Sequence, residues 1–159
     1  ILGYGLCGKG TFGIRAQNCQ IVIPRIEDCI PLFLGSPEAY QKERRKEPGT
    51  YYLTKGWIEY GSDALKDYQK WVERYGERKA RILVNVTYKD YTRIGLINTG
   101  SYDVFGYWDY VQKLSAFLKT KSEVIPGSMC LFEALAKSEW DKGFILINPG
   151  AEIERMMFQ

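Results

Sequence analysis

The side chains most able to do chemistry in this chain are its thiols. The 159 residues contain no histidine and four cysteines, which are Cys7, Cys19, Cys29 and Cys130. The lack of histidine excludes a Ser-His-Asp triad, a Cys-His nucleophile pair, a histidine zinc site and an imidazole pH switch. The cysteines are spaced 12, 10 and 101 residues apart, which gives neither a CxxC pair nor a secreted disulfide framework. We therefore predict reduced thiols, and a metal site would have to use thiolates, carboxylates or backbone groups.

Three of the thiols follow predicted buried strands. Cys7, Cys29 and Cys130 come after the apolar runs at 1–4, 20–23 and 123–125. Because parallel strands end at one edge of a sheet, where ligands bind, these three cysteines are candidate ligands for zinc or an iron-sulfur cluster. Cys29 is expected in a first helical turn, where the helix dipole favours thiolate. Burial for packing alone is the alternative for each thiol, and Cys19 is predicted to be an ordinary buried or loop thiol.

The glycine-rich opening matches a nucleotide fingerprint in spacing only. Residues 3–8 and 8–13 both read GxGxxG, but only six residues, 14–19, separate Gly13 from the next predicted strand. That is too short for the crossover helix that would present its amides to a pyrophosphate, so a nicotinamide or flavin site is disfavoured. Gly5 and Gly8 remain candidates for holding a phosphate or another anion through backbone amides. No GK[ST] follows, which excludes a Walker loop.

Polar side chains are expected at the same edge as the thiols. Arg25 is predicted to pair with Glu27 or with an anionic ligand, and Asn98 follows the middle strand as a further candidate for cofactor binding. Glu27 or Asp28 could act as a general base or oxygen ligand. Asp28 is the favoured N-cap of the helix that begins near Cys29.

Apolar runs alternate with helical patterns along the chain. The predicted strands are 1–4, 20–23, 94–97, 123–125 and 144–147, and the predicted helices are 64–75, a second after Gly76, 107–118 and 129–136, the last capped by Ser128. This order predicts an α/β fold with a mostly parallel sheet of about five strands and helices on both faces, a Rossmann-like three-layer arrangement. The aromatic stretch at 47–60 is predicted to be loop-like, either a lid or partner surface or a sealed connection.

Composition indicates an ordinary globular protein. Apolar residues make up 45% and charged residues 26%, and the net charge of +3 comes from interleaved residues, which disfavours nucleic acid as a partner. No run is long enough to span a membrane and no signal peptide opens the chain, so we predict a cytoplasmic protein without a membrane partner. We predict a single domain over 1–159. It is expected to lack its N-terminal side, since Ile1 is predicted to lie inside a strand.

Several motifs together resemble a bacterial and archaeal family catalogued as domain of unknown function 1638. They are GYGLCG at 3–8, IPR at 23–25 with DC at 28–29, LFLGS at 32–36, PGTYY at 48–52 and GWIE at 56–59. The resemblance implies an additional strand and helix before residue 3, and it carries no established activity. Where the family pattern often reads histidine, this chain has Glu27, which could substitute as an oxygen ligand.

The resemblance also implies a metabolic setting. Family members are often encoded near corrinoid-dependent methyltransferases in anaerobes, including methylamine systems, which suggests a role in one-carbon metabolism. Our leading hypothesis is a metal- or metallocofactor-binding protein that uses Cys7, Cys29 and Cys130, with zinc, an iron-sulfur cluster or a corrinoid as the cofactor. The alternatives are an accessory subunit whose residues 51–60 contact a corrinoid protein or methyltransferase, and a nucleotide-binding enzyme that uses the glycine loop. The sequence does not decide whether the protein is an enzyme.

Overall fold

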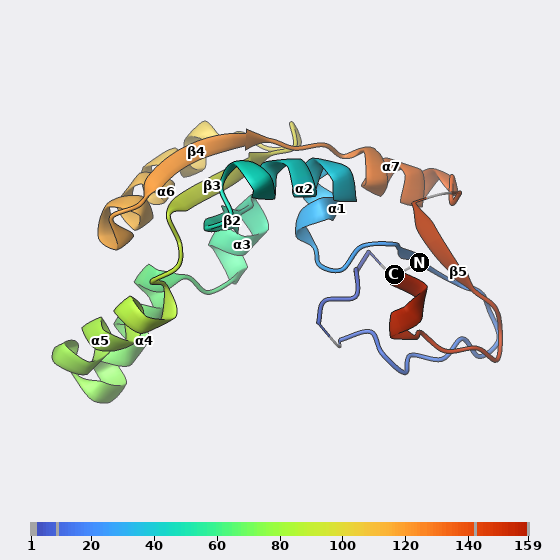
Figure 1. Ribbon diagram of the computed structural model, residues 1–159, viewed down its shortest axis with the longest axis horizontal. Helices are drawn as coiled ribbons and strands as arrows, with labels where there is room; N and C mark the ends of the chain where they lie inside the picture. The colour runs from blue at the N-terminus through green and yellow to red at the C-terminus, as the bar shows by residue number, and fades with distance from the viewer. Residues whose placement is uncertain (1–2, 9, 142, 159) are drawn as a thin grey trace. The chain divides into compact units, whose positions relative to one another are not determined.

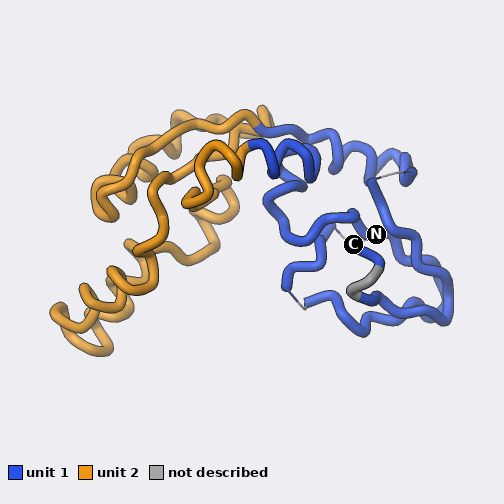
Figure 2. The backbone as a smooth tube through the Cα atoms, in the orientation of Figure 1, with its two compact units in different colours: residues 1–42, 127–159 blue, residues 43–126 orange. Residues whose placement is uncertain are grey.

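The computed structural model describes residues 3–8, 10–141 and 143–158, and the chain divides into two compact units (Figure 2). One unit joins the two ends of the sequence, residues 1–42 and 127–159, and the other is the middle segment, 43–126. We call them the terminal unit and the central unit.

The central unit contains a parallel sheet. Its strands are β2 (Thr50–Leu53), β3 (Arg93–Asn98) and β4 (Lys121–Pro126), in the order β2-β3-β4 (Figure 1). The register pairs Thr50 with Arg93 and Arg93 with Lys121. The connections between these strands contain α3 (Lys55–Tyr60), α4 (Ala64–Tyr75), α5 (Glu77–Thr87) and α6 (Phe105–Leu118).

One face of this sheet carries the main apolar core. Leu53, Ile94 and Leu96 pack there with Val111 and Leu114 of α6, and all five side chains are fully buried. The pattern arises because alternate strand residues share a face and helical residues three or four apart share a stripe. Burying an aliphatic side chain of this size stabilises the fold by about 1.5–3 kcal/mol, so this face holds the unit together.

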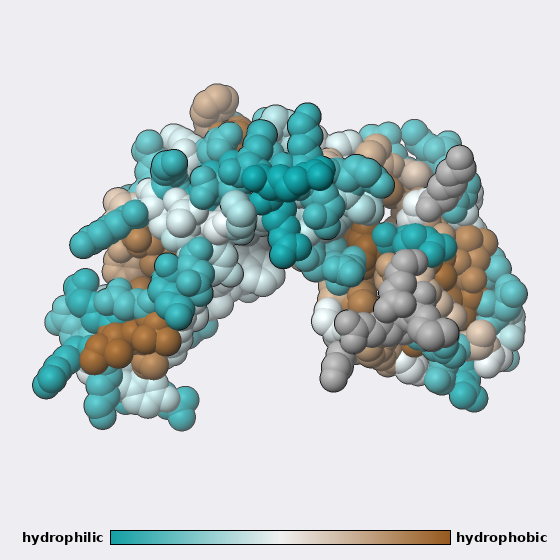
Figure 3. Space-filling model, in the orientation of Figure 1, coloured by the Kyte–Doolittle hydropathy of each residue, from teal (hydrophilic) through white to brown (hydrophobic). Residues whose placement is uncertain are grey.

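Helices α4 and α5 form a hairpin beside this core (Figure 1). Asp63 begins α4 because its Oδ1 accepts the amide hydrogens of Leu65 and Lys66, at 3.0 and 3.2 Å. Gly76, at φ 79°, lies between the two helices. The hairpin also exposes apolar side chains, since Ile82 is 56% and Val86 64% exposed. Figure 3 shows a brown, hydrophobic patch in the place where Figure 1 draws α4 and α5.

Two polar networks are built into the central unit. On the other face of the sheet, the buried Arg93 guanidinium forms ion pairs with Glu43 at 2.8 Å and Glu123 at 2.6 Å. Beside the apolar core, the fully buried Asp63 accepts a hydrogen bond from the Tyr110 hydroxyl at 2.6 Å. Each buried charge therefore has a partner, as burial requires.

The terminal unit is built around two antiparallel strands. In that unit β1 (Ile21–Pro24) pairs with β5 (Phe144–Ile147), and Ile23, Ile145 and Ile147 form a small core. The other elements are α1 (Ile30–Leu34), α2 (Pro37–Lys46), α7 (Cys130–Lys137) and a short 3-10 helix, η1 (Arg155–Phe158). The boundary between the two units falls within α2.

The α/β class is confirmed, but a uniformly parallel sheet of about five strands is wrong. Three strands form the parallel sheet, and β1 and β5 pair separately and antiparallel. A four-residue apolar run shows that a strand is buried but carries no information on the direction of its partner, because partner choice depends on residues far away in sequence.

Two local predictions also need correction. Gly3 and Tyr4 are not in a strand, and residues 1–2 of that predicted run lie outside the described residues. The stretch at 47–60 is not a loop, since it contains β2 and α3. Its Thr-Tyr-Tyr-Leu segment combines β-branched and aromatic residues that favour a strand once Pro48 and Gly49 have ended the preceding helix.

Among the described residues, none of the helices is both long and apolar enough to cross a membrane.

Candidate thiol site

In the terminal unit, the glycine-rich loop packs against the segment that leads into α1. The amides of Leu6 and Cys7 donate to the carbonyl oxygens of Ile26 and Glu27, each at 2.8 Å. Gly5 makes this approach possible, because a Cβ there would lie 2.7 Å from both Cγ1 and O of Ile26. The structure therefore explains Gly5 by close backbone contact within the protein.

Cys7 is held in an unusual backbone conformation. Its φ is +46° and that of Gly8 is +73°, so two successive residues are left-handed. This region is costly for a residue other than glycine. The turn places Cys7 on the wall of a pocket of about 240 Å³, which is also lined by Tyr4, Gly10, Thr11 and Ile14.

Thr11 was not predicted as part of this region. Its side chain is buried, and Oγ1 lies 3.4 Å from the Leu6 carbonyl oxygen and 3.5 Å from that of Gly5. It therefore braces the loop that carries Cys7. The available signal was its place within the glycine-rich run, where a lone hydroxyl residue can bond to neighbouring carbonyls.

Cys29 lies at the start of α1, beside Cys7. The Asp28 Oδ1 accepts the amide hydrogen of Ile30 at 2.8 Å, but the N-cap residue of α1 is Cys29, so the prediction of Asp28 as the N-cap is wrong by one position. Burial raises the pKa of the Cys29 thiol, and electrostatic interactions with Cys7 and Asp28 raise it further. The expected dipole-stabilised thiolate is thus wrong, because α1 has five residues and burial outweighs it.

Cys130 lies at the other end of α1. Its Sγ is 3.2 Å from the carbonyl oxygen of Gly35, the C-cap residue of α1, and its amide donates to Ser128 Oγ at 3.1 Å. The N-cap residue of α7 is Met129, so the prediction of Ser128 as the cap is wrong by one position. From Cys29 to Gly35 the helix rises about 9 Å. Thiolates that share a zinc ion each lie about 2.3 Å from it. The structure therefore brings Cys7 and Cys29 together and leaves Cys130 apart.

The remaining predicted residues are dispersed. The Arg25 guanidinium donates to the Met157 carbonyl oxygen at 2.9 Å, and Glu27 is exposed. Gly8 is exposed and supplies the turn described above. Asn98 belongs to the central unit, where its Oδ1 accepts the Gly100 amide hydrogen at 2.9 Å. Cys19 is an exposed loop thiol.

No disulfide occurs between the described cysteines, and no three histidine, cysteine, aspartate or glutamate side chains of the described residues gather as a metal site. The site that the structure does form is a pair of thiols, Cys7 and Cys29, with the Asp28 carboxylate close to the second. Two thiols can bind a soft cation, form a disulfide or remain as neutral packing groups.

The model of the family described as "protein of unknown function (DUF1638)" matches residues 1–136. The chain belongs to this family. The match includes the thiol pair, the whole central unit and most of α7. Comparison with curated proteins found no match, and neither did comparison with solved structures.

Proposed function

We propose that this member of the family binds a thiophilic metal ion through Cys7 and Cys29. The observation that supports this proposal is the docking of the glycine-rich loop, in which the Cys7 amide bonds to Glu27 two residues before Cys29. A left-handed Cys7 is costly, and such strain persists where a position has a task. Thiolate ligands favour zinc, copper(I) and iron-sulfur clusters.

The site would leave coordination positions open. Two thiolates complete half of a tetrahedral zinc shell, and the pocket beside Cys7 provides about 240 Å³ for a further ligand. Pockets for whole small molecules begin at about 300 Å³. A corrinoid ring exceeds that space, so in a one-carbon role the corrinoid would be carried by a partner protein and the metal here would act with it.

Metal binding at this pair must depend on pH. The pKa of Cys29 is raised, so its thiol is protonated at neutral pH and loses its proton when a metal binds. Affinity should therefore increase with pH through the neutral range.

The test is a zinc titration of the anaerobically purified full chain in competition with a chromophoric chelator. We expect one ion per chain. Cys7→Ser and Cys29→Ser should each lower affinity at least about tenfold, since one thiolate of two is lost. Cys19→Ser is the matched control and should have no effect.

Cys130→Ser decides whether the third predicted thiol takes part. Because Cys130 lies at the opposite end of α1 from Cys29, we expect Cys130→Ser to bind zinc with wild-type affinity. A loss of zinc affinity as large as that of Cys29→Ser would support a site of three cysteines. Zinc binding that persists in both Cys7→Ser and Cys29→Ser would reject the proposal.

A second candidate function is an accessory role in a methyltransferase system. It is favoured by α3, where Tyr60 is 87% exposed and Trp57 46% exposed, although Trp57 Nε1 is bonded to Tyr51 Oη at 3.1 Å. Aromatic side chains are enriched at protein interfaces. The exposed end of α3 would contact the corrinoid protein or methyltransferase.

Pull-down with those proteins tests this second candidate. Tyr60→Ser should abolish capture without changing zinc affinity, because Tyr60 lies in the central unit. Tyr75→Ser, on a helix of the same unit and 43% exposed, is the control. Equal capture by Tyr60→Ser and wild type would reject a role for α3.

A further inference from the structure

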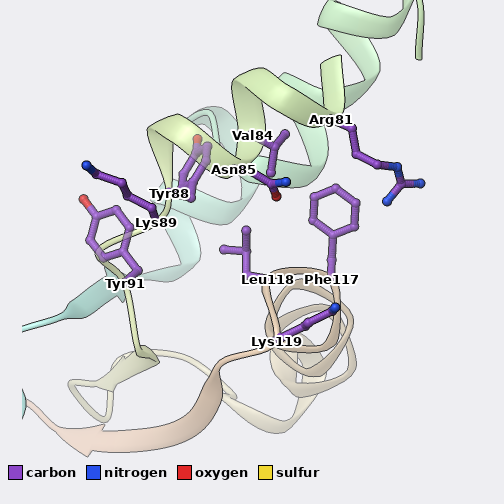
Figure 4. A pocket seen from close by; sticks show the side chains of 9 residues that line it. All are labelled: Arg81, Val84, Asn85, Tyr88, Lys89, Tyr91, Phe117, Leu118 and Lys119. Carbon is purple, nitrogen blue, oxygen red and sulfur yellow. The ribbon is translucent and has the colours of Figure 1, made fainter. Parts of the chain in front are cut away.

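A second pocket lies within the central unit, between α5 and the end of α6 (Figure 4). Its volume is about 290 Å³, close to the lower limit for small-molecule sites. Its floor is apolar and aromatic. Val84 of α5 and Tyr88, the C-cap residue of α5, are buried there, and Phe117 and Leu118 of α6 are half-buried.

The rim of the pocket is cationic. Arg81 and Asn85 come from α5 and Lys119 follows α6; all three are exposed (Figure 4). The figure shows the Arg81 guanidinium and the Asn85 amide on either side of the Phe117 ring, with the Lys119 side chain below the ring. Lys89 adds a third positive charge at the opposite end.

Little in the protein competes for these charges. Arg81 pairs with Glu77 at 3.5 Å, but both side chains are more than 60% exposed, and such a pair contributes little. Its guanidinium also lies 5.5 Å from the centre of the Tyr68 ring. No ion pair of Lys119 occurs within the described part of the chain. The pocket therefore combines hydrogen-bond donors and positive charge with an aromatic wall.

Lys119 occupies a position that would suit glycine. It is the C-cap of α6 with φ +57°, a left-handed conformation that glycine adopts at helix ends without cost. A lysine therefore stands here against backbone preference, and its side chain lines the pocket.

We propose that this pocket binds a small phosphate monoester of an aromatic or heteroaromatic ring. Arg81 and Lys119 would hold the dianion, with Asn85 donating a further hydrogen bond, and the ring would lie against Phe117 and the floor. This site is separate from the thiol pair and does not depend on its metal.

The probe is phenyl phosphate, titrated into the full chain at low ionic strength and followed by amide chemical shifts. We expect saturable shifts confined to residues 81–91 and 117–119. Inorganic phosphate, which lacks the ring, and phenol, which lacks the charge, should each bind at least about fivefold more weakly.

Lys119→Gly is the decisive variant. It removes a cation and relieves the left-handed strain, so it should bind phenyl phosphate at least about fivefold more weakly while unfolding at the same temperature or higher. Arg81→Gln should weaken binding similarly. Lys79→Ala removes the same charge from α5, but Lys79 lines a different groove and should leave affinity unchanged.

Three outcomes would overturn the proposal. They are an absence of saturable shifts with phenyl phosphate, equal affinity for inorganic phosphate, and wild-type affinity in Lys119→Gly. Cys7→Ser should bind phenyl phosphate normally, which keeps this test distinct from that of the metal site.

Discussion

The two units differ in whether their ionisable groups have partners of opposite charge. In the central unit, buried charges are matched by partners, as Arg93 is by Glu43 and Glu123. In the terminal unit, the groups that shift the pKa of Cys29 include Cys7 and Asp28 but no cation. The charges of the Arg93 network are therefore balanced within the protein, whereas a thiolate at Cys29 would need a cation such as the metal ion that we propose.

The pKa values express the same contrast. Burial opposes ionisation of Glu43, but hydrogen bonds from Lys46 and Arg93 outweigh it and lower the pKa of Glu43. Nothing comparable offsets burial at Cys29, whose pKa is raised. The charges of the central unit are thus satisfied within the fold, whereas the metal binding that we propose for the thiols requires Cys29 to give up a proton that its surroundings favour.

Removing Arg93 should have the largest effect. Arg93→Met leaves Glu43 buried without its main cationic partner and should lower the free energy of unfolding by about 3–5 kcal/mol. Arg44→Ala, at an exposed position of α2, should change it by less than about 0.5 kcal/mol. Denaturant unfolding measures both.

Acid should reduce the difference in stability between wild type and Arg93→Met. Because the pKa of Glu43 is lowered in the folded protein, its stabilising contribution is complete at neutral pH and disappears as pH falls through the folded value. The gap between wild type and Arg93→Met should therefore shrink toward pH 3. The double variant Glu43→Leu/Arg93→Met should recover much of the lost stability at pH 7. If it does not, the loss in Arg93→Met does not come from an unpaired Glu43.

Asp63 tests the second network. Asp63→Ala removes the cap of α4 and the acceptor of the Tyr110 hydroxyl, and should cost about 2–4 kcal/mol. Tyr110→Phe keeps the cap and should cost about 1 kcal/mol. Thermal unfolding of both variants separates the two contributions, and equal losses would mean that the cap contributes nothing.

Local signals explain why α4 could be predicted to the residue. Asp63 and Gly76 mark its ends, and the apolar spacing between them is helical, so the prediction of 64–75 is confirmed. The strand at 144–147 is also confirmed, since an apolar run bounded by turn residues is a local feature. These elements depend on residues within one turn or one strand.

Pairings between distant segments could not be predicted in that way. The antiparallel pairing of β1 and β5 joins residues 120 to 126 positions apart, and the burial of Arg93 depends on Glu43 and Glu123. The same holds for the thiols. Placing three cysteines at one edge required a single parallel sheet, which the chain does not form. Cys130 belongs to the same unit as Cys7 and Cys29 but lies at the opposite end of α1 from Cys29.

Gly5 links the fold of the terminal unit to its proposed chemistry. Gly5→Ala would place a Cβ against Ile26 and should displace the glycine-rich loop, at a cost of about 1–3 kcal/mol. Zinc affinity should fall although Gly5 is not a ligand. Gly3→Ala, where a Cβ would meet nothing within 4 Å, is the control. Normal zinc affinity in Gly5→Ala would show that loop docking does not assemble the thiol pair.

The smallest expected effect is on the reactivity of the Cys29 thiol rather than on stability, and it tests directly whether the two units differ in how their ionisable groups are paired. Because the pKa of Cys29 is raised above that of an ordinary thiol, its rate of alkylation by iodoacetamide should continue to increase about tenfold per pH unit beyond pH 8.5. Peptide mass spectrometry distinguishes it from the exposed Cys19.

Cys7→Ser removes one of the charges that raise the Cys29 pKa, so the alkylation profile of Cys29 should shift to lower pH. Cys130→Ser should leave that profile unchanged, because Cys130 lies at the other end of α1. A profile that Cys7→Ser does not move would mean that the two thiols are not electrostatically coupled. The terminal unit would then hold two independent cysteines, and its contrast with the paired charges of the central unit would no longer indicate a metal site.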